Sequence, residues 1–311
     1  MPGLTERTLQ RLRRSLGARR AAEAPRTQSP LPAGALVPGT LLGGYRIERL
    51  IGRGAMGAVY LAVDPRNDLA VALKTLALAQ EFDDADYAAA RQRFLQEAAT
   101  ASRLQHPDIV ALYGAGEDRG IAFLAMEALA GSDLSRYTRP SRLLPEPIVL
   151  RIVARVAEAL AYAHQQGVVH RDVKPANVMV DLPTHQVKVT DFGIARCTDA
   201  ARTRTGLTIG TPAFMAPEQL AGDAPDAASD LYALGVMLFQ LLTGRLPYEG
   251  DSMGRLLKAI ATEPPLALHT LRPSLPPALA PLMAGLLAKS PRARSRDGHE
   301  VAAALLAVRF D

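Results

Sequence analysis

The 311-residue chain has one cysteine, no tryptophan, and only five lysines among its 36 basic residues. The lone Cys197 excludes an intramolecular disulfide and a zinc site built from cysteines, and it is typical of a reducing compartment. Long apolar runs are also missing, since Ala278–Ala288 covers only 11 residues and contains a proline and a glycine. That run is far too short for a membrane span. We therefore expect a cytoplasmic protein without a transmembrane segment.

The net charge of +5 belongs to one end of the chain. Residues 1–43 hold seven arginines and two glutamates, whereas the other 268 residues carry 29 basic and 29 acidic side chains. A neutral body does not favour a nucleic-acid-binding fold, so we expect no nucleic-acid partner. Residues 21–44 are rich in Pro, Gly, Ala and Thr, a composition typical of a linker. We predict a basic, largely disordered arm over residues 1–43, whose role would be to dock a partner or to regulate.

Hydrophobic patterning divides the rest of the chain into a β-rich part and a larger helical part. Strand-like stretches cover 45–51, 58–63 and 69–76, with turn residues between them. A helix is predicted from about Asp84 to Gln105, with Phe94, Ala98, Ala101 and Leu104 on one face. After Gly131, helical patterns dominate, notably at 147–166, 229–243 and 275–288. The predicted fold class is therefore α+β.

Gly52, Gly54 and Gly57 form a G-x-G-x-x-G pattern. A dinucleotide-binding site requires a helix directly after these glycines, whereas residues 58–63 are β-prone and lead into a turn. The glycines are therefore predicted near the tip of a hairpin, where backbone N–H groups can approach phosphate oxygens closely. An ordinary flexible hairpin is the alternative.

Lys74 ends an apolar strand-like stretch, Val71-Ala72-Leu73-Lys74. A lysine in this position must reach solvent or meet an anion. Glu97 follows Phe94 by three residues and precedes Ala101 by four, which places it on the inward stripe of its helix. We predict a Lys74–Glu97 ion pair that directs the ammonium towards nucleotide phosphates.

Two further motifs lie in the second half of the chain. The segment His170-Arg171-Asp172-Val173-Lys174-Pro175-Ala176-Asn177 holds five polar side chains in a short loop before an apolar strand. Nineteen residues after Asp172, Asp191-Phe192-Gly193 follows another β-like stretch. With the glycine loop, Lys74 and Glu97 upstream, the chain from Tyr45 to Phe310 resembles the eukaryotic-like Ser/Thr protein kinases of bacteria.

The resemblance implies a two-lobed protein kinase fold that transfers the γ-phosphoryl group of ATP to Ser or Thr hydroxyls of proteins. The kinase domain would cover residues 44–311, with a small N-lobe (44–127), a larger C-lobe (128–311) and ATP between them. Lys174 and the Gly210-Thr211-Pro212 sequence favour Ser/Thr over Tyr as acceptor. Because Phe310 is the penultimate residue, we expect regulation to come from the arm, the activation segment or a partner.

The resemblance also implies roles for individual residues. Asp172 would orient the acceptor hydroxyl, and Lys174 would offset charge on the transferring group. The other implied catalytic residues are Lys74, Glu97 and Asn177. Asn177 and Asp191 would bind Mg²⁺ through hard oxygen atoms. His170 is expected to pack the loop rather than to act as a base.

A larger set is implied to bind ATP. It comprises Ile51, Gly52, Arg53, Gly54, Ala55, Met56, Gly57, Val59, Ala72, Lys74, Glu127, Leu129 and Met179, with Met126 at the back of the adenine pocket and Asp133 towards the ribose. Ala128 departs from the aromatic residue common in this family, which removes an apolar contact. Packing alone would equally explain the apolar members of the set.

The segment Thr198–Glu218 resembles an activation segment that ends in a shelf for the substrate peptide. Glu218 would pair with Arg294, with Arg292 as the alternative, and Asp230 would brace the catalytic loop. Thr203 and Thr205 have the spacing of autophosphorylation sites in relatives. A solvated, threonine-rich loop is the alternative for these two residues.

Two other functions remain open from the sequence. A nucleotide-sensing pseudokinase would lack transfer activity, but the chain retains Lys74, Glu97, Asp172, Asn177 and Asp191. A small-molecule kinase of the aminoglycoside type would share the two acids but generally lacks the peptide shelf at 210–218.

Overall fold

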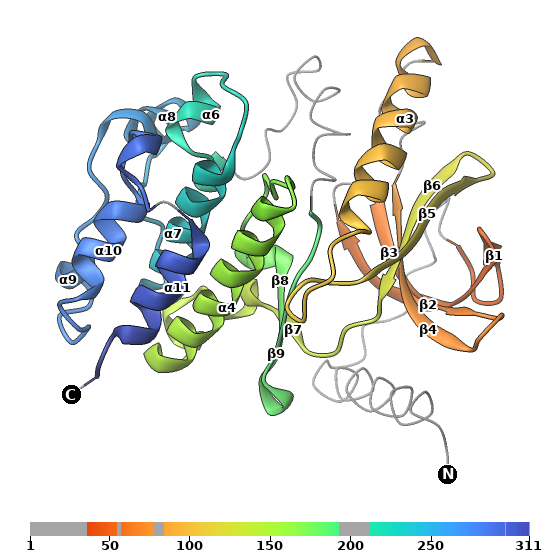
Figure 1. Cartoon of the computed structure of the whole chain (residues 1–311), viewed down its shortest axis with the longest axis horizontal. Helices are drawn as coiled ribbons and strands as arrows, with labels where there is room; N and C mark the ends of the chain where they lie inside the picture. The colour runs from red at the N-terminus through yellow and green to blue at the C-terminus, as the bar shows by residue number, and fades with distance from the viewer. Residues whose placement is uncertain (1–35, 55–56, 77–83, 193–211, 296, 311) are drawn as a thin grey trace. The chain divides into compact units, whose positions relative to one another are not determined.

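The computed structural model describes residues 36–54, 57–76, 84–192, 212–295 and 297–310. These residues form two compact units. Unit 1 comprises the described residues of 36–105 and 110–131, and unit 2 comprises 106–109 and the described residues from 132 to 310. Figure 1 labels the elements of both. Among the described residues, no helix is long and apolar enough to cross a membrane.

Unit 1 contains a six-stranded antiparallel sheet in the order β1-β2-β3-β4-β6-β5. The strands are β1 (Leu41–Leu42), β2 (Tyr45–Gly54), β3 (Gly57–Asp64), β4 (Leu69–Leu76), β5 (Leu112–Asp118) and β6 (Ile121–Glu127). Strands β2, β3 and β4 confirm the three strand-like stretches of the sequence.

One face of the sheet carries the core of unit 1. Because strand side chains alternate between faces, every second residue of neighbouring strands contributes to it. The core residues are Leu42, Tyr45, Ile47, Tyr60, Ala62, Val71, Leu73, Phe123 and Ala125. The opposite face of β4 and β6 also carries buried side chains, among them Ala72, Leu124 and Met126.

The start of the described chain also belongs to the sheet. Leu36 packs against the core and its N–H donates to the Tyr60 hydroxyl oxygen at 3.2 Å. Leu42 is fully buried, and Leu41 pairs with Arg46 across β1 and β2. Part of the segment expected as a linker is thus folded, because its leucines have a hydrophobic core to enter.

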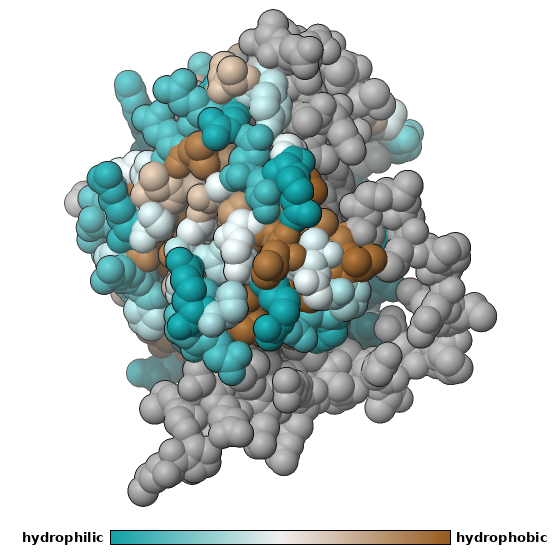
Figure 2. Space-filling model, turned by 90° about the vertical axis from the view of Figure 1, so that its right-hand side faces the viewer, coloured by the Kyte–Doolittle hydropathy of each residue, from teal (hydrophilic) through white to brown (hydrophobic). Residues whose placement is uncertain are grey.

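Apolar surface remains on unit 1. Figure 2 shows apolar side chains gathered among hydrophilic ones on the face towards the viewer. The exposed large apolar side chains of the unit include Leu41, on the edge strand β1, and Tyr113, on the edge strand β5. Both edges of the sheet thus carry an exposed apolar side chain.

Helix α3 (Asp84–Ala101) completes the described part of unit 1. Ala90, Phe94, Ala98 and Ala101 are buried, which confirms the apolar face predicted from the sequence. Leu104 is also buried but lies beyond the end of the helix. The helix ends at Ala101, four residues before the predicted end at Gln105.

Unit 2 is mainly helical. Its α-helices are α4 (Glu146–Gln165), α6 (Pro217–Leu220), α7 (Ala227–Thr243), α8 (Met253–Thr262), α9 (Leu268–Leu271), α10 (Leu279–Leu286) and α11 (Gly298–Ala307). A small sheet consists of β7 (Ser132–Asp133), β8 (Val178–Asp181) and β9 (Gln186–Val189), in that order. Helix α11 packs against α4, where a Cβ on Gly298 would lie 2.1 Å from the Ala157 carbonyl oxygen.

Helix α7 is the buried axis of this unit. Asp226 caps its N-terminus by accepting from Ser229 N at 3.1 Å, and Gly244 ends it in the left-handed conformation. Helix α10 is shorter than the predicted 275–288. At its start, Pro276 and Pro277 disfavour the helical conformation of the residues that precede them, Leu275 and Pro276. Helix α7 confirms the predicted 229–243 and starts two residues earlier.

Candidate active site

Asp172 and Lys174 face each other in the loop between α4 and β8. Lys174 Nζ donates to Asp172 Oδ1 at 2.9 Å and to Oδ2 at 2.7 Å. The Lys174 side chain is 21% exposed and the Asp172 side chain 27%, so solvent or a substrate can reach both. The structure therefore brings together two residues that the resemblance assigns to the transfer step.

Asn177 joins the same group from the 3₁₀ helix η3 (Pro175–Asn177). Its Nδ2 donates to the Asp172 carbonyl oxygen at 2.7 Å and to Asp172 Oδ2 at 2.9 Å. Both partners are acceptors, which fixes the amide orientation and leaves Oδ1 as the remaining polar atom of the buried side chain.

Asp191 follows β9 and is tied to this loop through its neighbour Thr190. The N–H of Thr190 donates to the Asn177 carbonyl oxygen at 2.9 Å, and its hydroxyl donates to the same atom at 3.2 Å. Asp191 adopts a positive φ of 65° and Arg171 one of 69°. Such backbone costs about 1–3 kcal/mol per residue and concentrates at functional sites.

The oxygen atoms of Asn177 and Asp191 fit the chemistry of a magnesium ion. In the part of the chain that the structure describes, no three His, Cys, Asp or Glu side chains form a metal site by themselves. Mg²⁺ commonly takes only one or two protein oxygens and completes its shell with water and phosphate. A magnesium ion that arrives with a nucleotide is therefore compatible with these residues.

Asp230, in the first turn of α7, holds the loop that contains Asp172. Its Oδ2 accepts from His170 N at 2.8 Å and its Oδ1 accepts from Arg171 N at 2.7 Å. His164 Nε2 lies 2.7 Å from the same Oδ2. The bracing role predicted for Asp230 is confirmed, and His164 is a partner that the sequence did not reveal.

The His170 ring packs inside the loop, as predicted. Its Nε2 donates to the Thr190 carbonyl oxygen at 2.8 Å, and its Nδ1 accepts from Asp172 N at 3.2 Å. The Phe192 ring lies 4.6 Å away between centroids. With both ring nitrogens engaged, His170 orients the backbone beside Asp172 rather than acting as a base.

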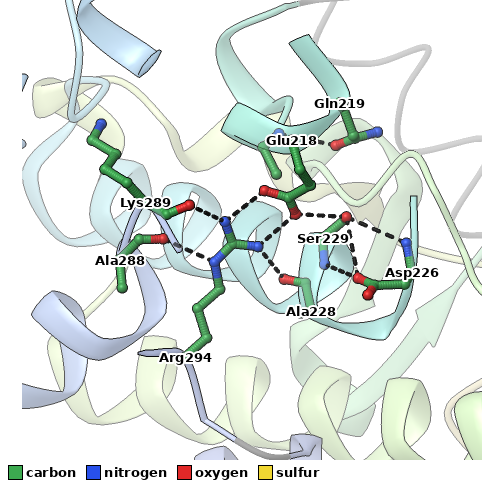
Figure 3. A network of polar contacts seen from close by, with 9 residues as sticks. Glu218, Gln219, Asp226, Ala228, Ser229, Ala288, Lys289 and Arg294 are labelled. Atoms are coloured by element: carbon green, nitrogen blue, oxygen red, sulfur yellow. Dashed lines mark hydrogen bonds and ion pairs between the residues drawn. The ribbon is translucent and has the colours of Figure 1, made fainter. Parts of the chain in front are cut away.

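Glu218 and Arg294 form the ion pair predicted from the resemblance (Figure 3). Arg294 Nη1 donates to Glu218 Oε1 at 2.6 Å and Nη2 to Oε2 at 2.7 Å. Its remaining N–H groups donate to the carbonyl oxygens of Ala228, Ala288 and Lys289, so all five are used. Arg292, the alternative left open by the sequence, is exposed.

Burial raises the pKa of Glu218, but hydrogen bonds offset this effect. The bonds from Arg294, from the backbone and from Ser229, together with the charge of Arg294, hold the pKa of Glu218 below its ordinary value of 4.5. The carboxylate is therefore ionised at neutral pH.

Lys289 was not assigned a role from the sequence. Its Nζ donates to the Ile260 carbonyl oxygen at 2.5 Å, near the C-terminus of α8, and lies 3.9 Å from the centre of the Tyr248 ring. Burial lowers the pKa of Lys289 to about 8. A cation at a helix C-terminus interacts favourably with the helix dipole.

In unit 1, several of the predicted ATP-binding residues share one face of the sheet. Strand pairing aligns Val59 with Gly52 on one side and Lys74 on the other, and it aligns Ala72 with Met126. Directly opposed residues point to the same face, and this face is the one opposite the core. The apolar positions and the lysine are therefore grouped as the resemblance implies.

The glycine pattern lies in a hairpin, as predicted, and not at the start of a helix. Gly54 pairs with Gly57 at the end of β2 and β3. Gly57 has a φ of +142°, and a Cβ there would lie 1.9 Å from the Thr75 carbonyl oxygen. Only glycine fits this position. Ala55 and Met56, the predicted residues between them, lie outside the described residues.

The remaining predicted residues are dispersed over both units. Glu97 lies in α3 beside buried Ala98, and its ion pair with Lys74 stays a prediction. Glu127 ends β6, where its N–H donates to the Ala111 carbonyl oxygen at 2.9 Å, and Leu129 follows. Met179 lies in β8 of unit 2, opposite Asp133. Cys197, Thr203, Thr205, Gly210 and Thr211 lie outside the described residues.

The model of the protein kinase domain family matches residues 45–305. The chain belongs to the protein kinase domain family. The fold predicted from the resemblance, a β-rich lobe and a helical lobe, is therefore confirmed.

Known kinases resemble this kinase domain in sequence and in structure. The Ser/Thr protein kinase pkn3 of Myxococcus xanthus is 43% identical over 277 residues, which cover 85% of this chain and 50% of pkn3. The crystal structure of the PknI kinase domain of Mycobacterium tuberculosis matches with a TM-score of 0.70 and 34% identity, covering 88% of this chain and 98% of that one.

A more distant structure contains a nucleotide analogue. Rad53, solved in complex with AMP-PNP, matches with a TM-score of 0.67 and 26% identity, covering 83% of this chain and 64% of that one. The chain spans about half the length of the curated relatives pkn3 and PknJ.

Proposed function

We propose that the chain is a Ser/Thr protein kinase that transfers the γ-phosphoryl group of ATP, with Mg²⁺, to protein Ser or Thr hydroxyls. The observation that carries this proposal is the loop in which Lys174 and Asn177 both donate to Asp172 while Asp230 holds the backbone. The family and the names of the relatives support the same reaction.

Asp172 has room for one more hydrogen bond. A carboxylate offers roughly four acceptor sites, and Lys174 and Asn177 occupy three of them. At the remaining site, the Ser or Thr hydroxyl of the protein substrate would donate its hydrogen to Asp172 and so be oriented for in-line attack. Its oxygen forms a bond to the γ-phosphorus as the bond to the β–γ bridging oxygen breaks, ADP leaves, and the proton passes to Asp172.

Lys174 and the metal ligands stabilise charge in this step. Lys174 lies beside Asp172, where its ammonium can offset charge on the transferring group. Asn177 Oδ1 and the Asp191 carboxylate would hold Mg²⁺, which would neutralise negative charge on the phosphates.

Unit 1 would bind the rest of the nucleotide. The backbone of residues 52–57 would approach the phosphates, and Lys74, oriented by Glu97, would pair with them. Ile51, Val59 and Ala72 would contact the adenine ring, and the backbone of Glu127 and Leu129 would hydrogen-bond it. The AMP-PNP bound to the related Rad53 is consistent with ATP as substrate.

We also propose that Thr203 and Thr205 are autophosphorylation sites. The phosphates would pair with Arg171 and order the activation segment. A chain with Thr203→Ala and Thr205→Ala should lose phosphate content and activity together. Unchanged activity and phosphate content would contradict this assignment.

The remaining features are proposals about the whole protein. We propose a cytoplasmic kinase that acts on protein substrates and has a basic arm that docks a partner. The predicted boundary between the arm (1–43) and the kinase domain (44–311, with lobes at 44–127 and 128–311) moves towards the N-terminus, because β1 belongs to the sheet of unit 1. Deletion of residues 1–35 should spare basal transfer, because the match to the protein kinase family begins at residue 45.

Incubation with γ-³²P-labelled ATP, Mg²⁺ and myelin basic protein tests the proposed function. Label on phosphoserine or phosphothreonine of the acceptor or of the chain itself is the expected result. ATP binding without any transfer would instead indicate a pseudokinase. If an aminoglycoside is added in a parallel incubation, label found only on the aminoglycoside would indicate a small-molecule kinase.

A further inference from the structure

Two consecutive residues in the first turn of α7 hold two different parts of unit 2. Ser229 and Asp230 are both buried, with 3% and 1% of their surface exposed. Asp230 receives the backbone N–H groups of the loop before Asp172. Ser229 instead contacts Glu218, which follows residues 212–217 directly (Figure 3).

The Ser229 hydroxyl has one hydrogen and two acidic neighbours. Its Oγ lies 2.7 Å from Glu218 Oε1 and 3.4 Å from Asp226 Oδ1. Only the shorter contact has the length of a strong O–H···O bond. Asp226 N donates to the same Oγ at 3.3 Å, which occupies a lone pair and helps to direct the hydrogen to Glu218.

Ser229 connects Glu218 directly to α7 through a hydrogen bond. Arg294 follows the 3₁₀ helix η6 (Pro291–Ala293), so its ion pair connects Glu218 to the segment between η6 and α11. The Ser229 bond ties the same carboxylate to α7. From there a single peptide bond leads to Asp230 and hence to the catalytic loop.

We propose that Ser229 is a positioning residue that sets Glu218, and with it the shelf residues 212–218, relative to the loop that carries Asp172. This role rests on the proposed kinase function, because the shelf would present the acceptor peptide. It differs from the helix-capping role of Ser229, in which its N–H donates to Asp226 Oδ1 and its Oγ accepts from Asp226 N. Replacement by alanine keeps the first capping bond and removes the second together with the bond to Glu218.

Thr243 provides a matched control on the same helix. Its buried hydroxyl donates to the Phe239 carbonyl oxygen at 2.8 Å, at the far end of α7. Thr243→Val removes a buried hydroxyl that has no contact with Glu218. A loss of general stability should therefore appear in both Thr243→Val and Ser229→Ala, whereas a positioning effect should appear only in Ser229→Ala.

The first measurement is steady-state transfer from ATP to myelin basic protein by the full chain. Ser229→Ala should raise the acceptor KM about 3- to 10-fold, the factor that corresponds to one net hydrogen bond, and leave the KM for ATP unchanged. Thr243→Val should leave both unchanged. Equal acceptor KM values for wild type and Ser229→Ala would overturn the proposal.

Hydrogen exchange gives a second readout that does not depend on activity. Ser229→Ala should speed exchange at residues 212–222 relative to wild type, and Thr243→Val should not. If Ser229→Ala fails to fold, Ser229→Cys keeps a similar volume with a weaker donor and should show the same change to a smaller degree. Identical exchange at 212–222 in the folded Ser229 variant and in Thr243→Val would overturn the proposal, whereas an inactive wild-type chain would overturn only the kinase function.

Discussion

Arg294 and Glu218 are 76 positions apart in the sequence, yet the guanidinium of Arg294 donates to both oxygens of the Glu218 carboxylate. The Arg294 side chain is fully buried and that of Glu218 is 10% exposed. The ion pair joins α6 to the segment just before α11. Every N–H group of the Arg294 guanidinium has an acceptor.

Removal of the Arg294 side chain should therefore lower the free energy of unfolding. Arg294→Ala leaves Glu218 as a buried charge without its counter-ion, a change that typically costs about 3–5 kcal/mol. Urea unfolding monitored by circular dichroism should show this loss. Arg292→Ala is the control, because Arg292 is exposed, and it should lie within about 0.5 kcal/mol of wild type. Equal losses in the two variants would contradict the assignment of Arg294.

The same pair predicts a contribution to acid unfolding. The pKa of Glu218 is lowered on folding, so its stabilisation is complete above the ordinary value of 4.5 and is lost as pH falls through the folded-state pKa. The unfolding free energy of wild type, relative to Glu218→Gln, should therefore decrease below pH 4.5. Urea unfolding at pH 3 to 7 measures this difference. A difference that does not vary with pH would show that Glu218 has no lowered pKa.

The two glycines at the hairpin should differ in tolerance. Gly57→Ala places a Cβ 1.9 Å from the Thr75 carbonyl oxygen at a φ of +142°. The backbone conformation alone costs about 1–3 kcal/mol for a residue with a side chain. Gly52→Ala meets no atom within 4 Å and should be tolerated. Thermal unfolding of both variants measures the contrast, and a Gly57→Ala variant as stable as Gly52→Ala would contradict the hairpin geometry.

The local patterns of the sequence predicted much of the fold. A strand-like apolar stretch between turn residues predicted β4 with its observed bounds, and the apolar stripe from Phe94 to Ala101 predicted α3. Strand β1 was missed because two residues carry no periodicity and gain their stability from pairing with β2. Helix α10 was predicted too long at its start because its apolar run begins in residues whose helical conformation the following prolines disfavour.

The candidate site likewise contains residues that the sequence could predict and residues that it could not. Asp172, Lys174 and Asn177 are close in sequence, so a motif could reveal them together. His164 reaches Asp230 through the packing of α4 against α7. Ser229 in α7 reaches Glu218 in α6 only because unit 2 folds these two helices together. A single buried serine or histidine has no local pattern that distinguishes this use. The choice between Arg292 and Arg294 likewise depended on which side of a short 3₁₀ helix faces the core.

Phosphate transfer by active-site variants tests the central claim most directly. Wild type, Asp172→Asn, Lys74→Met and the exposed-site control Asp223→Asn should be compared with γ-³²P-labelled ATP and myelin basic protein, after circular dichroism has shown that each is folded. We predict that Asp223→Asn transfers phosphate like wild type, that Asp172→Asn is slower by a factor on the order of 10² to 10⁴, and that Lys74→Met gives no detectable transfer. Transfer at the wild-type rate by folded Asp172→Asn would contradict the mechanism.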